Sequence, residues 1–240
     1  MRDLSIKDFN LTPRLSLVAS FVKKNSIVAD IGTDHAMLPI FLIKNGFAKK
    51  VYATEISTYS YKRAKENIAA SGLQNGIDVL LCDGLKAVPN DYDTIVLAGM
   101  GGELIAEIIE KGKPKNSVAL ILQPMTSSVK LRRFLYENGY VIEDEALIKE
   151  RRRLYSVIHA VKGFEKKTTY NEFEVHIPKS MSCADKTLYE EYLNKTIKKH
   201  ITMIDGFKIA GNEYKEQAEY SLKIINDLQN LKTDLSRHQF

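Results

Sequence analysis

The sequence lacks long apolar runs and has only two cysteines among its 240 residues. No stretch approaches the roughly 20 apolar residues of a membrane-spanning helix, and the N-terminus has no apolar run typical of a secretion signal. Cys82 and Cys183 lie far apart and match no metal-ligand spacing. We therefore expect a cytoplasmic protein with free thiols, no metal and no membrane association. A monomer is compatible with this composition.

A large charge excess is also missing. The net charge is +5 and falls entirely in residues 1–163, where 23 Lys and Arg oppose 18 Asp and Glu; residues 164–240 hold 12 of each. An excess of this size is compatible with a polyanionic partner, and also with an ordinary solvated surface.

Short apolar runs alternate with helical patterns over the first 163 residues. The expected strands are 27–31, 51–56, 77–81, 94–98 and 119–122, and the expected helices are 37–44, 59–71, 103–111 and 129–138. This succession predicts a parallel sheet with helices on both faces. Residues 140–149 and 154–161 then follow with only a short charged connection, which predicts an antiparallel pair. Five parallel strands closed by a hairpin form the Rossmann-like sheet of class I methyltransferases.

The last part of the chain has a different pattern. Residues 164–182 indicate a linker, and from residue 185 two amphipathic helices are expected around a break between Gly206 and Gly211. We therefore predict a methyltransferase domain over 1–163 and a linker with a coiled-coil-like helical hairpin over 164–240. The hairpin is either a packing appendage or a substrate-binding arm. The expected apolar faces are Leu188, Tyr192, Ile197, Ile201 and Ile204 in the first helix and Ala218, Leu222, Ile225, Leu228, Leu231 and Leu235 in the second.

The first strand leads into the candidate cofactor motif, Asp30 through Asp34. A dinucleotide site would have three glycines in G-x-G-x-x-G, whereas only Gly32 is present, followed by Thr33 and Asp34. A carboxylate would repel a pyrophosphate but attract the sulfonium and ammonium groups of S-adenosylmethionine. The motif therefore favours that methyl donor over a nicotinamide. The alternative is an ordinary strand-to-helix turn with Asp34 as a helix cap.

Two more strands are followed by acidic residues. Glu55, with Ile56 next to it, ends the second strand, where a carboxylate can accept hydrogen bonds from a ribose diol. Asp83 and Gly84 follow the third strand, where a side-chain acceptor can bind an adenine amino group. Ligands of open α/β sheets bind outside the carboxyl ends of the strands, so these residues extend the predicted cofactor site.

The fourth strand ends in a glycine-rich segment that contains Gly99, Met100 and Gly101, which suggests backbone against a ligand or strained dihedral angles. The [DN]-P-P-[YF] motif of exocyclic-amine methyltransferases is absent, which points to a ring nitrogen or a carbon as acceptor. The fifth strand ends in Gln123 and Pro124, either as part of the same functional edge or as simple termination of a strand by proline.

Together these motifs resemble the bacterial tRNA adenine-22 N1-methyltransferase family. The resemblance covers residues 11–161 and is carried by LTPRL, ADIGTDHAMLP, ATEIS, CDGL, AGMGG and LQP. It implies methylation of N1 of an adenosine in the D-arm of tRNA, with S-adenosylmethionine as donor and a C-terminal coiled-coil domain. The chain departs from the family at Thr33, where the family has serine, at Met37, where it has tyrosine, and at Met125, where it has asparagine.

In this reading Asp34 or His35 would orient the base or accept its proton, and the alternative for His35 is a structural helix cap. Two rival functions stay open: methylation of another RNA, a protein or a small molecule, and catalytically silent RNA binding. Candidate RNA contacts are Arg14, Gln123, Lys130, Arg132, Arg133, Arg151, Arg152 and Arg153.

Overall fold

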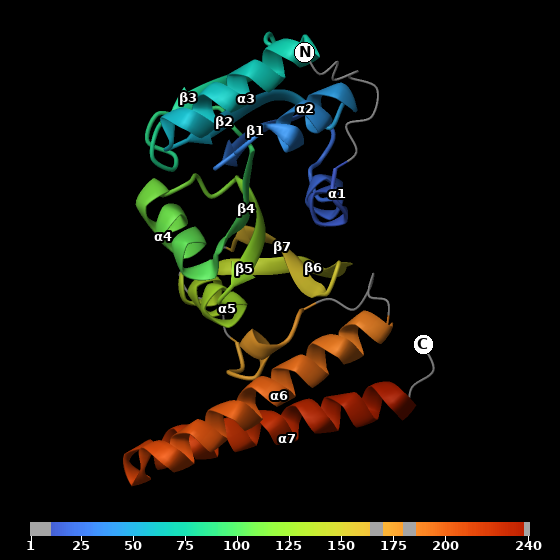
Figure 1. The fold of residues 1–240 in the computed structure, drawn as a ribbon, viewed down its shortest axis with the longest axis vertical. Helices are drawn as coiled ribbons and strands as arrows, with labels where there is room; N and C mark the ends of the chain where they lie inside the picture. The colour runs from blue at the N-terminus through green and yellow to red at the C-terminus, as the bar shows by residue number, and fades with distance from the viewer. Residues whose placement is uncertain (1–10, 164–169, 180–185, 238–240) are drawn as a thin grey trace. The chain divides into compact units, whose positions relative to one another are not determined.

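The computed structural model describes residues 11–163, 170–179 and 186–237. The chain forms two compact units, Met1–Thr169 and Tyr170–Phe240. The first unit holds the sheet and the second holds two long helices (Figure 1). Within the described residues, no helix combines the length and the apolar character needed to span a membrane.

Seven strands form one sheet in the order β3-β2-β1-β4-β5-β7-β6. The first five strands are parallel, and β7 pairs antiparallel with both β5 and β6. This arrangement confirms the predicted methyltransferase sheet. The strands are β1 (Ser26–Ile31), β2 (Ala48–Glu55), β3 (Ile77–Leu81), β4 (Thr94–Gly101), β5 (Ala119–Thr126), β6 (Tyr140–Glu150) and β7 (Arg153–Lys162).

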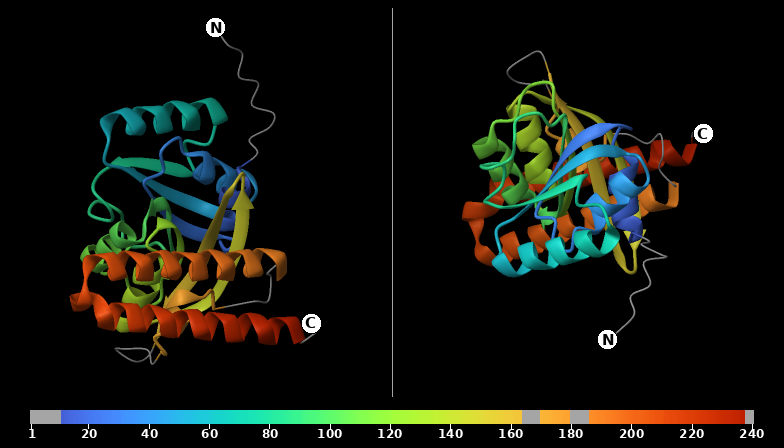
Figure 2. Two further views of the ribbon diagram at one scale, coloured as in Figure 1. Left: turned by 60° about the horizontal axis from the view of Figure 1, so that its bottom comes forward. Right: turned by 90° about the horizontal axis from the view of Figure 1, so that it is seen from above.

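Helices cover both faces of the sheet. Right-handed crossovers put α2 (Met37–Lys44) and α3 (Thr58–Ser71) on one face, where α1 (Pro13–Ser20) contacts α2. The other face carries α4 (Gly102–Gly112) and α5 (Ser128–Glu137), which contact each other. Figure 2 shows these two layers from two further directions. The sequence analysis did not predict α1, which begins with Thr12 as N-cap and Pro13 in its first turn.

β4 and β5 continue by three and four residues beyond their predicted ends. β5 runs through Pro124 to Thr126, and Pro124 pairs with Met100 of β4. The interpretation of Pro124 as the end of a strand is therefore wrong. The β4–β5 ladder shifts register on either side of Met100, and such an irregularity lets a strand continue where proline cannot donate a hydrogen bond.

The β6–β7 hairpin turns through Arg151 and Arg152, and Arg151 has a positive φ of 56°. Because β7 runs antiparallel to β5, its N-terminal end and this turn lie at the edge where the parallel strands end. The arginines of the turn and the cofactor motifs therefore lie along the same edge of the sheet.

The second unit consists of a short 3-10 turn (Glu174–His176), α6 (Lys186–Ala210), a second 3-10 turn (Asn212–Tyr214) and α7 (Lys215–Arg237). The predicted break between Gly206 and Gly211 is shorter than expected, because α6 continues through Gly206 and ends only before Gly211. One glycine costs a helix about 1 kcal/mol, which the packing of α6 against α7 offsets. The predicted apolar faces are partly wrong, because Ile201 and Leu222 are exposed whereas Tyr189 and Leu193 are buried.

A chain of polar side chains connects the segment before α6 with α6 and α7. His200 of α6 lies 3.3 Å from His176, His176 lies 2.8 Å from the Tyr220 hydroxyl of α7, and that hydroxyl donates to Glu172. Val175 and His176 are buried, although their segment was predicted to be part of a linker. The described residues before α6 therefore contribute to the core of the helical unit; Cys183 lies outside the described residues.

Candidate active site

The loop after β1 has an unusual backbone. Gly32, Asp34 and Ala36 all have positive φ, at 71°, 53° and 56°. The amides of Gly32 and Thr33 both donate to the Thr54 carbonyl of β2, which ties the loop to the neighbouring strand. Non-glycine residues adopt positive φ only under local constraint, and such positions cluster at functional sites.

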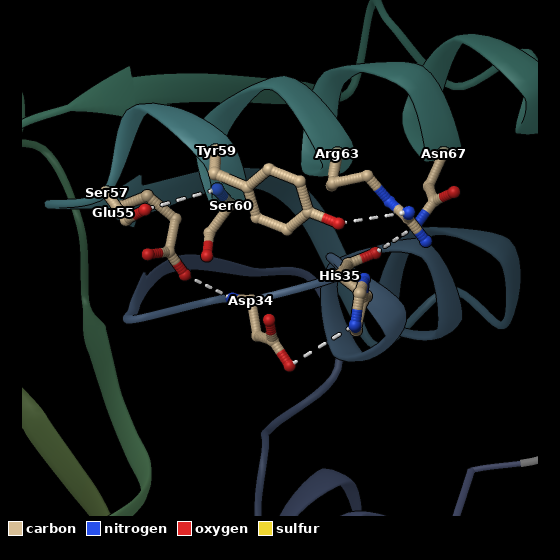
Figure 3. Close-up of polar contacts among 8 residues, drawn as sticks. All are labelled: Asp34, His35, Glu55, Ser57, Tyr59, Ser60, Arg63 and Asn67. Carbon is tan, nitrogen blue, oxygen red and sulfur yellow. Dashed lines mark hydrogen bonds and ion pairs between the residues drawn. The ribbon is translucent and has the colours of Figure 1, made fainter.

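Neither Asp34 nor His35 caps the helix that follows. The N-cap of α2 is Ala36, and no side chain forms a capping hydrogen bond there. The interpretation of these two residues as helix caps is therefore wrong. The Asp34 side chain is 71% exposed, and its carboxylate lies 3.7 Å from Nε2 of His35 (Figure 3).

Gly32 has a packing reason for lacking a side chain. A Cβ at this position would lie 2.3 Å from Cε of Met100, so the glycine lets Met100 of β4 approach the β1 loop. The two predicted cofactor motifs are thus in contact.

The buried carboxylates of Asp30 and Glu55 lie next to the loop that follows β1. Burial raises the pKa of Asp30 to about 6, and the charge of Glu55 reinforces this effect. Burial also raises the pKa of Glu55, which accepts a hydrogen bond from the Asp34 amide. A carboxylate has about four acceptor sites, so Glu55 can bind a polar ligand while it accepts the backbone hydrogen bond.

The other predicted cofactor residues lie farther along the edge. Ile56 is exposed beyond β2, and Asp83 forms an ion pair of 2.6 Å with Lys86, which lowers the pKa of its carboxyl group. Gly84 has a φ of 59°. A cavity of about 290 Å³ opens beside these residues, lined also by Leu104 and Ile108 of α4.

The glycine-rich segment at the end of β4 and the start of α4 serves two purposes. Gly99 has a φ of 83°, which favours glycine. Gly102, by contrast, is required for packing, because a Cβ there would lie 2.6 Å from the Ser127 carbonyl oxygen. Gly101 similarly approaches Thr126. The prediction of strained backbone holds for Gly99, whereas the close approach of Gly101 and Gly102 is to β5 and the residue after it.

Gln123 is fully buried and organises this segment from β5. Its side-chain oxygen accepts hydrogen bonds from the Gly99 amide, at 3.1 Å, and from the Arg14 guanidinium. Its amide nitrogen donates to the Pro124 carbonyl. The prediction that Gln123 contacts RNA is therefore wrong in this conformation, because no part of the side chain reaches the surface. Arg14 is half-buried, and its guanidinium also lies 5.8 Å from the ring centre of Tyr155.

Arg132 is also not an RNA contact. Its side chain is 0% exposed and forms hydrogen bonds of 3.0 and 2.6 Å with both carboxylate oxygens of buried Glu145. A guanidinium in a bidentate pair inside the protein cannot reach a phosphate at the surface. The apolar residues near Arg132 on α5 do not by themselves indicate that the arginine side chain is buried.

The remaining candidate RNA contacts differ in exposure. Arg151, Arg152 and Arg153 are exposed at the hairpin turn, and Arg133 is half-buried. Lys130 is exposed and pairs with Glu103, which lowers the pKa of that carboxyl group. Among the described residues, no group of three His, Cys, Asp or Glu side chains could hold a metal ion.

The sequence analysis missed one residue that supports the site. The Asn67 side chain of α3 donates to the His35 carbonyl at 2.9 Å, and it thereby holds the loop between Asp34 and Ala36 (Figure 3). Asparagine in the middle of a helix carries no distinctive sequence signal, so only the folded structure identifies this contact.

Comparisons with known proteins agree with this geometry. A family model described as a methyltransferase domain matches residues 11–158. The chain is 38% identical over 161 residues to the tRNA (adenine(22)-N(1))-methyltransferase of Bacillus subtilis, covering 66% of this chain and 68% of that protein.

Two solved structures extend the similarity to the helical unit. The B. subtilis M1A22 tRNA methyltransferase TrmK matches with a TM-score of 0.76 at 28% identity, over 93% of this chain and 99% of that one. M. capricolum TrmK in complex with S-adenosyl-homocysteine matches with a TM-score of 0.74 at 27% identity, over 94% and 98%. The identity to the B. subtilis enzyme, over two thirds of its length, and the match to the methyltransferase domain model show that the chain belongs to the tRNA (adenine(22)-N(1))-methyltransferase family.

Proposed function

We propose that this chain transfers a methyl group from S-adenosylmethionine to N1 of adenine 22 in the D-arm of tRNA. One structural observation supports this proposal. Buried Glu55 and the exposed Asp34–His35 pair lie at the same edge of the sheet as the arginine turn. A donor site and a cationic surface on one edge are what methyl transfer to a polyanion requires.

The residues present fit the methyl donor. The open acceptor sites of Glu55 suit a ribose diol, and the carboxylate of Asp34 favours a positively charged ligand. The cavity beside Asp83 and Gly84 offers room for an adenine ring. When bound, S-adenosylmethionine supplies an electrophilic methyl group.

The chain's own residues position the acceptor. The lone pair of adenine N1 lies in the ring plane, so the reaction needs alignment more than activation of the nucleophile. The base has to leave its stack to present N1, which costs a few kcal/mol. Asp34 and His35 then orient the base or accept the proton that N6 becomes able to lose on methylation. Arg151, Arg152 and Arg153 contact phosphates of the tRNA backbone. A tRNA substrate places the reaction in the cytoplasm.

The direct test is incubation of the full chain with unmodified tRNA and labelled donor, followed by mass spectrometry of the nucleosides. We expect 1-methyladenosine, and mapping of the labelled tRNA should place it at position 22. Label in protein or in small molecules instead of tRNA would favour another methyltransferase activity. Salt-dependent tRNA binding without any methyl transfer would favour the silent RNA-binding protein.

Two variants test the assigned residues. Glu55→Ala should weaken donor binding by about 1–3 kcal/mol in calorimetry, whereas the exposed carboxylate Glu66, changed to Ala, serves as control. Asp34→Asn should lower turnover more than tRNA affinity, because its carboxylate faces the reacting centre. Normal turnover of Asp34→Asn at saturating substrates would remove that residue from the mechanism.

A further inference from the structure

The first half of α3 presents aromatic and cationic side chains together. Tyr59 is 68% exposed, and the guanidinium carbon of Arg63 lies 6.0 Å from the centre of its ring. The Arg63 Nη1 also donates to the Tyr59 hydroxyl at 3.4 Å. No Asp or Glu of the described part of the chain forms an ion pair with Arg63. The guanidinium lies beside the Tyr59 ring and its hydroxyl, and its charge is available to an anion.

This pair belongs to a stripe that faces the candidate active site. Tyr59, Arg63 and Asn67 follow one another at intervals of four residues, which places them on one face of α3. The third member, Asn67, donates to the His35 carbonyl and so fixes the direction of the stripe. In Figure 3, the side chains of Tyr59 and Arg63 extend from α3 on the side of the loop that carries Asp34 and His35.

The charge of the stripe does not match the methyl donor. The donor carries a sulfonium and an ammonium group, and the carboxylates of Asp34 and Glu55 already provide the complementary charge. A guanidinium beside an exposed aromatic ring matches a nucleotide instead, because the cation suits the phosphate and the ring can stack on a base.

We propose that Tyr59 and Arg63 bind the tRNA strand beside the methylated adenine, with Arg63 on a backbone phosphate and Tyr59 stacked on a neighbouring base. This inference rests on the function proposed above. It gives the substrate a second contact region, because α3 follows β2 whereas the arginine turn joins β6 and β7. β2 and β7 are four strand spacings apart, or about 19 Å. The strand would thus be held on both sides of the extruded base.

The test measures binding of an unmodified tRNA transcript to the full chain by fluorescence anisotropy at several salt concentrations. Arg63→Ala should weaken binding severalfold and reduce the slope of log K against log salt by about 0.7 to 0.9, the effect of losing one phosphate contact. Tyr59→Ala should weaken binding about fivefold or more. Tyr59→Phe keeps the ring and should bind tRNA close to wild-type affinity.

Lys65→Ala provides the matched control. It removes one positive charge from the same helix, but Lys65 points away from the stripe by the helical period and lies 5.5 Å from the Tyr61 ring. We expect tRNA affinity within twofold of wild type for this variant, with circular dichroism showing equal helix content in all variants. An equal loss in Lys65→Ala and Arg63→Ala would overturn the proposal, since it would indicate a general charge effect of α3.

A second measurement separates this proposal from the proposed function. Calorimetry of donor binding should give unchanged affinity in Tyr59→Ala and Arg63→Ala. A loss of donor affinity with wild-type tRNA affinity would assign the stripe to the methyl donor and overturn the inference, although 1-methyladenosine formation by the wild type would still support the proposed function. Absence of tRNA methylation by the wild type would refute the function itself.

Discussion

Replacing Gln123 by leucine should disturb both the fold and the donor site. The side chain is fully buried, and its oxygen is the shared acceptor for the Gly99 amide and the Arg14 guanidinium. Leucine has a similar volume, so Gln123→Leu removes the acceptor without opening a large cavity. The change therefore isolates the contribution of the hydrogen bonds that connect α1, β4 and β5.

The magnitude follows from the groups that lose a partner. The hydrogen bond from the Gly99 amide contributes about 0.5–1.5 kcal/mol, and the hydrogen bond from the charged Arg14 about 1.5–3 kcal/mol. Water can replace part of both contributions, because Gly99 is exposed and Arg14 is half-buried. We therefore expect Gln123→Leu to lower the free energy of unfolding by about 1–3 kcal/mol in total. Donor affinity should fall as well, because Gly99 lies in the predicted cofactor segment.

Urea unfolding followed by circular dichroism measures the first effect, and calorimetry measures the second. Gln74→Leu makes the same chemical change at an exposed position and should stay within about 0.5 kcal/mol of wild type. A double-mutant cycle with Arg14→Met should give a coupling energy of about 0.5–3 kcal/mol. An unfolding free energy for Gln123→Leu equal to that of Gln74→Leu would refute the reasoning.

Three other predictions concern charge and domain organisation. The pKa of Asp30 is raised from 3.8 to about 6, so the folded state holds this proton more tightly and wild-type stability falls as pH rises from about 4 to 6. Asp30→Asn should therefore be more stable than wild type by up to about 3 kcal/mol at pH 8 and by much less below pH 4. If urea unfolding gave the same difference in unfolding free energy between variant and wild type at both pH values, the prediction would be contradicted. Arg132→Met should cost about 3–5 kcal/mol in the same assay, because the buried Glu145 carboxylate loses both hydrogen bonds from the guanidinium. The double variant Arg132→Met/Glu145→Leu should recover most of the loss, an expectation that fails if the double variant is no more stable than Arg132→Met. A chain ending at Thr169 should bind the donor normally but methylate tRNA at least about tenfold more slowly, equivalent to about 1.4 kcal/mol. Undiminished methylation would make the helical unit a packing appendage. Loss of donor binding would mean that the helical unit completes the core.

The sheet could be predicted because its strands are short apolar runs separated by clear helical patterns. The ranges 37–44 for α2 and 77–81 for β3 agree with the structure, and the other predicted ends in the sheet unit agree with it to within four residues. β5 was predicted too short because proline usually ends a strand, whereas here a register shift accommodates Pro124. α1 was missed because it is only eight residues long and its start depends on the Thr12 cap.

The candidate site was predictable where chemistry follows strand ends, as for Asp30 and Glu55. Exposure was not predictable, because Arg132 and Arg133 are neighbours of the same type in sequence. Arg132 is internal only because Glu145 of β6 lies opposite it, a partner that the chain places 13 residues away. The role of Gln123 likewise depends on Arg14, 109 residues earlier. Pairings over such distances arise from the fold and leave no local pattern.

The chain of polar side chains in the helical unit fixes how its two helices align. An antiparallel pair held only by apolar side chains could slide by one helical turn, about 5.4 Å, with modest loss of contact. Sliding of α7 would separate the Tyr220 hydroxyl from His176 and remove a hydrogen bond from a buried imidazole, and burial of a polar group that has lost its hydrogen bond is unfavourable. A buried polar group sets the register of coiled coils in the same way. The alignment of α6 with α7 therefore fixes the distance between the base and the tip of the hairpin. A substrate that the hairpin contacts would meet its tip at that distance.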